Sequence, residues 1–166
     1  MPLTTIKTGH VAPGFALKSV EGTKYSLDEL LAHGPVVLGF FKISCPVCQL
    51  TFPFLQRIFE RFAGSNASVI GVSQDEPRLT KEFNRQQGVT FPTLLDDNAY
   101  AVSNAYGLTS VPVVLLIAPD GEVKVSLVGF DKAGLEKIAG ELAQYQNIAS
   151  IPLFLPTESV PAHKPG

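Results

Sequence analysis

The 166-residue chain has two cysteines, Cys45 and Cys48, separated by only two residues. A disulfide that closes so short a loop constrains the unfolded chain little, and a small scaffold stapled by disulfides needs more cysteines spread along the chain. The pair is therefore better explained by reactivity than by stability. The chemistry open to two such thiols is reversible disulfide exchange, in which a thiolate attacks a disulfide.

The cysteines lie where a predicted buried strand gives way to a helix. The run 36–41 is continuously apolar and partly β-branched, which is typical of a strand buried on both faces of a sheet. After Cys48, apolar residues recur at helical spacing: Leu50, Phe54, Leu55, Ile58, Phe59 and Phe62. Unpaired N–H groups and the helix dipole then favour a thiolate at Cys45. Because Cys48 lies one turn further in, we expect Cys45 to attack and Cys48 to resolve.

The residue types around the cysteine pair argue against other functions for it. A structural zinc site needs four ligands, but there is no second cysteine pair and the three histidines are scattered. Covalent haem attachment requires a histidine directly after the second cysteine, where Gln49 stands. We therefore expect no metal and no cofactor, with inert buried cysteines as the remaining alternative. Lys42 would add a positive charge near Cys45, unless it is an ordinary solvated lysine.

Strand and helix patterns alternate along the rest of the chain. A hairpin is predicted around Glu21-Gly22, and Ser26 with Glu29 forms a capping-box pattern for a helix that runs to about Ala32. The later predicted elements are a strand at 67–72, a helix from 75 to 88, an extended piece at 91–95, a helix at 97–106, strands at 113–117 and 122–128, and a helix at 131–146. This order predicts an α/β sandwich with a mixed central sheet flanked by helices.

The length fits one domain, which we assign to residues 1–150, followed by a proline-rich C-terminal tail at 151–166. The tail begins with the apolar piece 151–155, which we expect to pack either on the body of the domain or on a partner chain. The second arrangement would allow a homodimer.

Charge and hydropathy exclude several partners. The formal net charge is -2 and no block of basic residues occurs, so neither nucleic acid nor an anionic membrane surface is an expected partner. The apolar run 111–118 is too short to span a bilayer. The segment 1–11 contains no apolar stretch of signal-peptide length, so the sequence as given predicts a cytoplasmic protein, with a trimmed export signal left open.

Several short motifs occur in a characteristic order along the chain. They are Ala12-Pro13-Gly14-Phe15, Phe40-Phe41, Cys45-Pro46-Val47-Cys48, Pro53, Gly88-Val89-Thr90-Phe91-Pro92, Ser110-Val111-Pro112 and Ala118-Pro119-Asp120-Gly121. With this order and spacing, residues 9–143 resemble the thioredoxin-like superfamily. The resemblance is to the branch of alkyl hydroperoxide reductase/thiol-specific antioxidant proteins (AhpC/TSA, or redoxins) and of the thiol–disulfide oxidoreductases of cytochrome maturation.

The resemblance implies a three-layer thioredoxin-like sandwich, with an extra helix–strand insertion within 75–106. It also implies that Pro112 is a cis proline facing the cysteines, and that the backbone of Val111 pairs with an incoming peptide. Pro46 and Val47, which lie between the sulfurs, would influence the reduction potential. The residues that support the cysteines are then Lys42, Ser44, Pro46, Val47, Val111 and Pro112.

The sequence departs from the family pattern near the cysteines. Gly39 stands where thioredoxins carry a buried acid, and Thr51 stands where the cytochrome-maturation relatives often carry glutamate, so no proton acceptor for Cys48 is evident. Ser44 replaces a frequent tryptophan. Leu38 and Lys42 occupy the positions of the proline and the threonine or serine that precede the peroxidatic cysteine in peroxiredoxins.

Three functional hypotheses follow. The first is a thiol–disulfide oxidoreductase that acts on protein or small-molecule disulfides and exchanges electrons with an unidentified thiol donor. The second is a thiol-dependent peroxidase, in which peroxide oxidises Cys45 to sulfenic acid and Cys48 resolves it. The third is a redox-sensing interaction module, for which the apolar piece 151–155 gives weak support.

Overall fold

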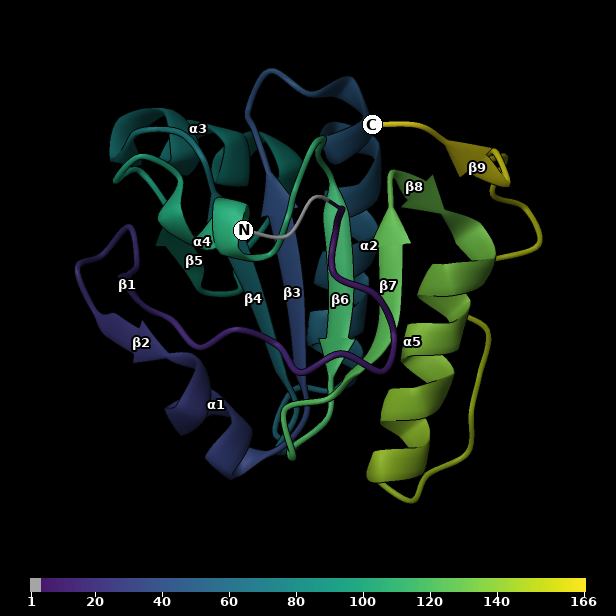
Figure 1. Ribbon diagram of the computed structural model, residues 1–166. Coiled ribbons are helices and arrows are strands. Elements are labelled where there is room, and N and C mark those ends of the chain that lie inside the picture. The colour runs from purple at the N-terminus through teal and green to yellow at the C-terminus, as the bar shows by residue number, and fades with distance from the viewer. Residues whose placement is uncertain (1–3) are drawn as a thin grey trace.

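The predicted apolar strands form the central sheet of the protein (Figure 1). The computed structural model describes residues 4–166, so the first three residues of the predicted domain lie outside it. The five strands are ordered β5(Thr93–Leu95), β4(Ser68–Ser73), β3(Val36–Phe41), β6(Val113–Ile117) and β7(Val123–Val128). Because β3 pairs in parallel with β4 and antiparallel with β6, the sheet is mixed, as predicted. All six residues of β3 are buried, which places the strand before Cys45 at the centre of the molecule.

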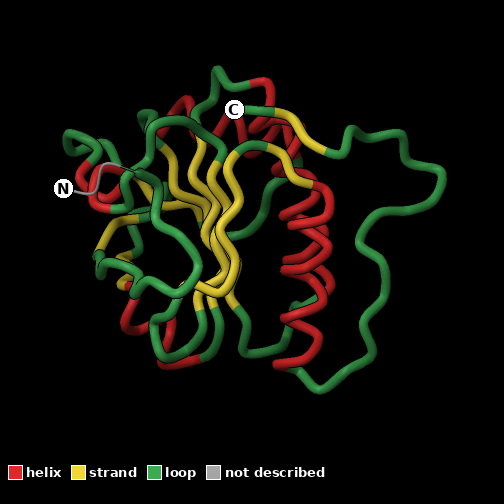
Figure 2. Tube along the Cα trace, turned by 45° about the vertical axis from the view of Figure 1, so that its right-hand side comes forward, coloured by secondary structure: helices red, strands yellow, loops and turns green. Residues whose placement is uncertain are grey.

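Helices cover both faces of the sheet, which confirms the three-layer sandwich (Figures 1 and 2). The side chains of β3 alternate between two apolar clusters, one on each face. One cluster is covered by α2(Pro46–Arg61), α3(Pro77–Gln87) and α5(Lys132–Tyr145). The other cluster contains side chains from α1(Leu27–His33) and from the region of α4(Ala101–Ala105), and the hairpin of β1(Ala16–Lys18) and β2(Lys24–Ser26) packs against it.

Local capping chemistry determines where several helices begin and end. The Ser26 hydroxyl accepts a hydrogen bond from the Glu29 amide at 3.2 Å and so caps α1, and the Asp131 carboxylate caps α5 through the Gly134 amide at 2.8 Å. Gly88 ends α3 in the left-handed conformation, with φ of 68°. These three boundaries are confirmed within a residue or two of the sequence prediction.

The predicted helix at 97–106 is wrong at its start, because α4 spans only Ala101–Ala105. Ala99 and Tyr100 have φ values of 54° and 55°, a left-handed backbone that a continuous helix excludes. The buried carboxylate of Asp96 accepts hydrogen bonds from the amides of Val102 and Ser103 at 3.1 and 2.7 Å. The cap therefore comes from a residue outside the predicted helix, reached across a turn.

The tail packs on the body of its own domain, which was one of the two arrangements expected. Phe154 is buried with its ring centroid 4.5 Å from that of Phe54 on α2, and Leu153 is buried beside it. From there the chain runs back along α5 (Figure 2) to β9(His163–Lys164), which pairs antiparallel with β8(Phe130–Asp131). This pairing was not predicted, since a proline-rich segment gives no strand pattern.

The buried tail predicts a measurable contribution to stability. Phe154→Ala removes an aromatic side chain from a packed cluster, so we expect the free energy of unfolding to fall by about 3 kcal/mol. Urea denaturation measures this loss. The neighbouring variant Leu155→Ala is the control, because Leu155 is 56% exposed and its truncation should cost no more than about 0.5 kcal/mol. Equal costs for the two variants would contradict the packing described.

Candidate active site

The two thiols meet at the first turn of α2. Cys45 is the N-cap residue, and its Sγ accepts a hydrogen bond from the backbone N–H of Cys48 at 3.1 Å. Pro46 occupies the first helical position, where a missing N–H costs nothing. An N–H donor and the positive end of a sixteen-residue helix both stabilise negative charge on sulfur. The predicted placement of Cys45 at a helix start is therefore confirmed.

The two sulfurs differ in exposure, as expected from their positions. Cys45 is partly exposed, whereas Cys48 is fully buried against the core of the domain. Burial raises the pKa of the Cys48 thiol far above its ordinary value, and the hydrogen bond with Cys45 raises that pKa further. Cys48 thus remains a protonated thiol near neutral pH until another group takes its proton, while Cys45 faces the approaching partner.

The loop before β6 brings a backbone acceptor to Cys45. The peptide bond between Val111 and Pro112 is cis, as the resemblance implied. The Cys45 S–H donates to the carbonyl oxygen of Val111 at 3.5 Å, although the two residues are 66 positions apart in sequence. Next to this loop, the Gly129 amide donates to the Pro112 carbonyl at 2.8 Å. The cysteine, the proline loop and the 128–130 turn therefore lie together at one end of the sheet.

The absence of a buried acid at position 39 has a steric cause. A Cβ on Gly39 would lie 2.7 Å from Leu55 Cδ1 and 3.2 Å from the Phe52 ring, so an acid there would have to displace two side chains of α2. Thr51 is no substitute, because its hydroxyl is buried and donates to the Val47 carbonyl at 2.7 Å. Neither position supplies a carboxylate for Cys48.

Asp75 is the charged residue near the pair that the sequence reasoning missed. It follows β4, and its carboxylate accepts a hydrogen bond from the Ile43 amide at 2.8 Å, which ties it to the loop that carries Cys45. Its negative charge also contributes to the raised pKa of Cys48. The sequence had suggested only a helix start at 75–77. The available signal was its position after a buried strand parallel to β3, since such strand ends meet at one edge.

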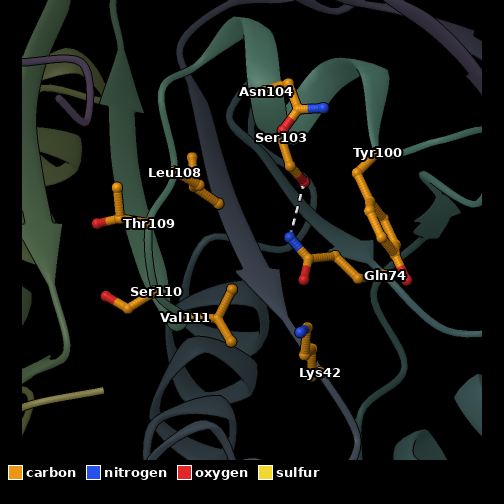
Figure 3. Close-up of a pocket in the computed structure, with 9 residues that line it drawn as sticks. All are labelled: Lys42, Gln74, Tyr100, Ser103, Asn104, Leu108, Thr109, Ser110 and Val111. Atoms are coloured by element: carbon orange, nitrogen blue, oxygen red, sulfur yellow. Dashed lines mark hydrogen bonds between the residues drawn. The ribbon is translucent and has the colours of Figure 1, made fainter. Parts of the chain in front are cut away.

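A small cavity of about 200 Å³ with a mixed polar and apolar lining lies beside the proline loop (Figure 3). Lys42 and Val111 line it together with Gln74, whose amide donates to the Ser103 hydroxyl at 2.9 Å. Among the residues that line the cavity, Lys42 is the charged one. Lys42 lines this cavity as an exposed residue, and its influence on Cys45 stays a prediction.

The remaining predicted site residues surround the cysteine pair without shared hydrogen bonds. Ser44 and Pro46 are exposed, and Val47 is half-buried against the core. Their influence on the reduction potential stays a prediction. Within residues 4–166, no group of three or more His, Cys, Asp or Glu side chains is placed to hold a metal ion. In the same range, no helix is long and apolar enough to cross a membrane.

Comparisons with known proteins agree with this geometry. The AhpC/TSA family model matches residues 8–126, and the chain belongs to this family. The thiol-disulfide oxidoreductase ResA of Geobacillus thermodenitrificans is 31% identical over 127 residues, which are 76% of this chain and 72% of ResA. The Helicobacter pylori protein bcp, which is named as a peroxiredoxin, is 34% identical over 105 residues. These residues are 61% of this chain and 68% of bcp.

Solved structures show the same fold. The thioredoxin domain of a thiol-disulfide oxidoreductase from Bacteroides vulgatus superposes with a TM-score of 0.72 at 20% identity, covering 84% of this chain and 98% of that domain. The thioredoxin-like sandwich and the redoxin family, both inferred from motifs, are therefore confirmed.

The burial of Cys48 predicts selective alkylation. In the reduced protein at neutral pH, iodoacetamide should label Cys45 while Cys48 stays largely unmodified, because Cys48 is inaccessible and protonated. Peptide mapping by mass spectrometry measures the two sites separately. Protein unfolded in urea is the control and should be labelled at both. Equal labelling of both cysteines in the folded protein would contradict the asymmetry.

The charge of Asp75 predicts a pH shift. In a Cys45→Ser background, Asp75→Asn removes a negative charge that disfavours the Cys48 thiolate, so the pKa of Cys48 should fall. Alkylation of Cys48 should then begin at a lower pH than in the Cys45→Ser protein alone. The exposed acid Asp97 provides the control, because Asp97→Asn should leave the profile unchanged. An unmoved profile for Asp75→Asn would show that its charge does not reach Cys48.

Proposed function

We propose that this protein is a thiol–disulfide oxidoreductase in which Cys45 is the nucleophile and Cys48 the resolving cysteine. The observation that carries the proposal is the placement of Cys45 at the N-cap of α2, with its sulfur between the Cys48 amide and the Val111 carbonyl. The thiol-disulfide oxidoreductases among the relatives support it. The substrates are protein or small-molecule disulfides, and a thiol of unknown identity serves as the electron donor.

The reaction runs in two exchanges. The Cys45 thiolate attacks one sulfur of the partner disulfide, forms a mixed disulfide, and releases the other partner sulfur as a thiolate that takes up a proton. Cys48 then loses its proton and attacks Cys45 Sγ. This step forms the Cys45–Cys48 disulfide and releases the second partner thiol. The partner gains two electrons and the protein loses two, and a thiol donor reverses the sequence to reset the pair.

The burial of Cys48 makes the second exchange the more difficult of the two, because it requires removal of a proton. Because its pKa is raised, Cys48 attacks only after its proton is removed, whereas Cys45 is partly exposed at the N-cap of α2. The carboxylate of Asp75 is the acidic group that acts on Cys48 electrostatically. We propose that it receives this proton directly or through water, in place of the buried acid for which the close packing at Gly39 leaves little space.

Two cysteine variants test the assignment. Cys45→Ser should abolish disulfide exchange with a small disulfide such as hydroxyethyl disulfide, because no nucleophile remains. Cys48→Ser should still react once and should accumulate a mixed disulfide on Cys45, which intact-mass spectrometry detects. Retained turnover in Cys45→Ser, or an adduct on Cys48, would refute the assigned roles.

A thiol-dependent peroxidase remains a second candidate, favoured by the likeness to the Helicobacter pylori bcp protein. In this reaction hydrogen peroxide oxidises Cys45 to sulfenic acid with release of water, and Cys48 condenses with it to the disulfide. Against it, Leu38 is fully buried in β3 and Lys42 lines the cavity, at the two positions where peroxiredoxins carry other residues. Loss of free thiols in stoichiometric peroxide, compared with an ordinary thiol, separates the two candidates.

A further inference from the structure

The last residues of the chain lie at the active-site end of the sheet. Figure 1 shows the C-terminal end close to the start of α2, and Figure 2 shows from a second direction that the chain ends at this end of the central sheet. Residues 162–166, termed here the cap segment, reach this place through β9. The Lys132 amide donates to the Ala162 carbonyl at 3.0 Å, and His163 Nε2 lies 3.3 Å from the Val128 carbonyl oxygen.

Two glycines let the cap segment approach the proline loop closely. A Cβ on Gly166 would collide with the carbonyl oxygen of Val111 and would lie 3.3 Å from Pro112 Cδ. A Cβ on Gly129, which has φ of 80°, would collide with the Lys164 carbonyl oxygen and would lie 3.1 Å from the Gly166 nitrogen. The cap segment therefore fills the space over Val111 and beside Gly129 without room for a side chain between them.

Val111 is also the residue whose backbone touches the reactive sulfur. Its carbonyl oxygen, which is in contact with Gly166, accepts the 3.5 Å hydrogen bond from Cys45. An extended substrate peptide that pairs with Val111 would need the place that Gly166 occupies. The cap segment already pairs as a strand with β8, in the way that an added peptide strand pairs with a sheet edge.

We propose that the cap segment acts as an internal competitor of protein substrates, because it fills the space over Val111 beside the reactive sulfur. This space is bordered by Val111, Pro112 and Gly129. A protein disulfide must displace the segment, whereas a small disulfide can reach the partly exposed Cys45 beside it. This inference rests on the proposed function and adds to it a selection between small and protein disulfides.

The tail is anchored unevenly, which allows the cap segment to leave alone. Its first part is held by the Arg57–Glu158 ion pair at 2.8 Å and by the Glu136 carboxylate, which accepts from the amides of Leu153 and Phe154. The cap segment is exposed and is held by a two-residue strand pairing, by the Lys132 amide and by the contact between His163 and the Val128 carbonyl. Its displacement therefore breaks few contacts and leaves the anchored part in place.

Two variants release the cap segment by different means. One ends the chain after Pro161, and the other is Gly166→Leu, whose side chain cannot fit against Val111. Lys164→Gln is the matched control, because it changes an exposed side chain and preserves the backbone pairing. Each protein is assayed with insulin, as a protein disulfide, and with hydroxyethyl disulfide, in excess dithiol reductant that resets the pair and against a blank without protein. The small substrate also reports whether each variant is folded and active.

We expect kcat/KM for insulin to rise by about fivefold or more in both releasing variants, because the cap segment no longer has to leave the space over Val111. The rate with hydroxyethyl disulfide should change less than about twofold, and Lys164→Gln should match the unaltered chain on both substrates. An unchanged insulin rate with intact turnover of hydroxyethyl disulfide would overturn the proposed role of the cap segment. An equal rise in rate with both substrates would overturn it as well. No turnover of hydroxyethyl disulfide by the unaltered chain would instead overturn the proposed function, and the cap with it.

Discussion

The hydrogen bond from the Cys48 amide to Cys45 Sγ is the contact around which this protein is organised. It exists only because α2 begins at Cys45, shortly after the fully buried strand β3 ends at the middle of the sheet. Gly39 lets the helix lie directly on that strand. The packing of α2 on β3 thus fixes the reactive sulfur and leaves little space for an acid beneath it.

The same packing separates the chemistry of the two thiols. Cys45 is left at the helix end with a donor on one side and the Val111 carbonyl on the other, while Cys48 is turned into the core. Burial keeps Cys48 a thiol until the mixed disulfide makes the neighbouring Cys45 Sγ open to its attack. The second exchange therefore depends on proton removal, and Asp75 is held near the site by its bond to the Ile43 amide.

Much of this could be predicted from sequence because the signals are local. The apolar run of β3, the helical spacing after Cys48 and the caps at Ser26 and Asp131 each lie within a few residues of the element that they specify. Features that depend on distant partners gave no such signal. The left-handed turn before α4, the role of Asp75 and the pairing of β9 with β8 all follow from contacts that form only in the folded chain.

The central claim is that Cys45 and Cys48 form one two-electron couple, and redox titration tests it most directly. The protein is equilibrated in glutathione buffers of graded ratio, trapped with acid, alkylated and analysed by mass spectrometry. The account predicts a single transition between the dithiol and an internal Cys45–Cys48 disulfide, with little glutathione adduct at equilibrium. A stable glutathione adduct on Cys45 that Cys48 never resolves, or a pair that stays reduced in every buffer, would contradict it.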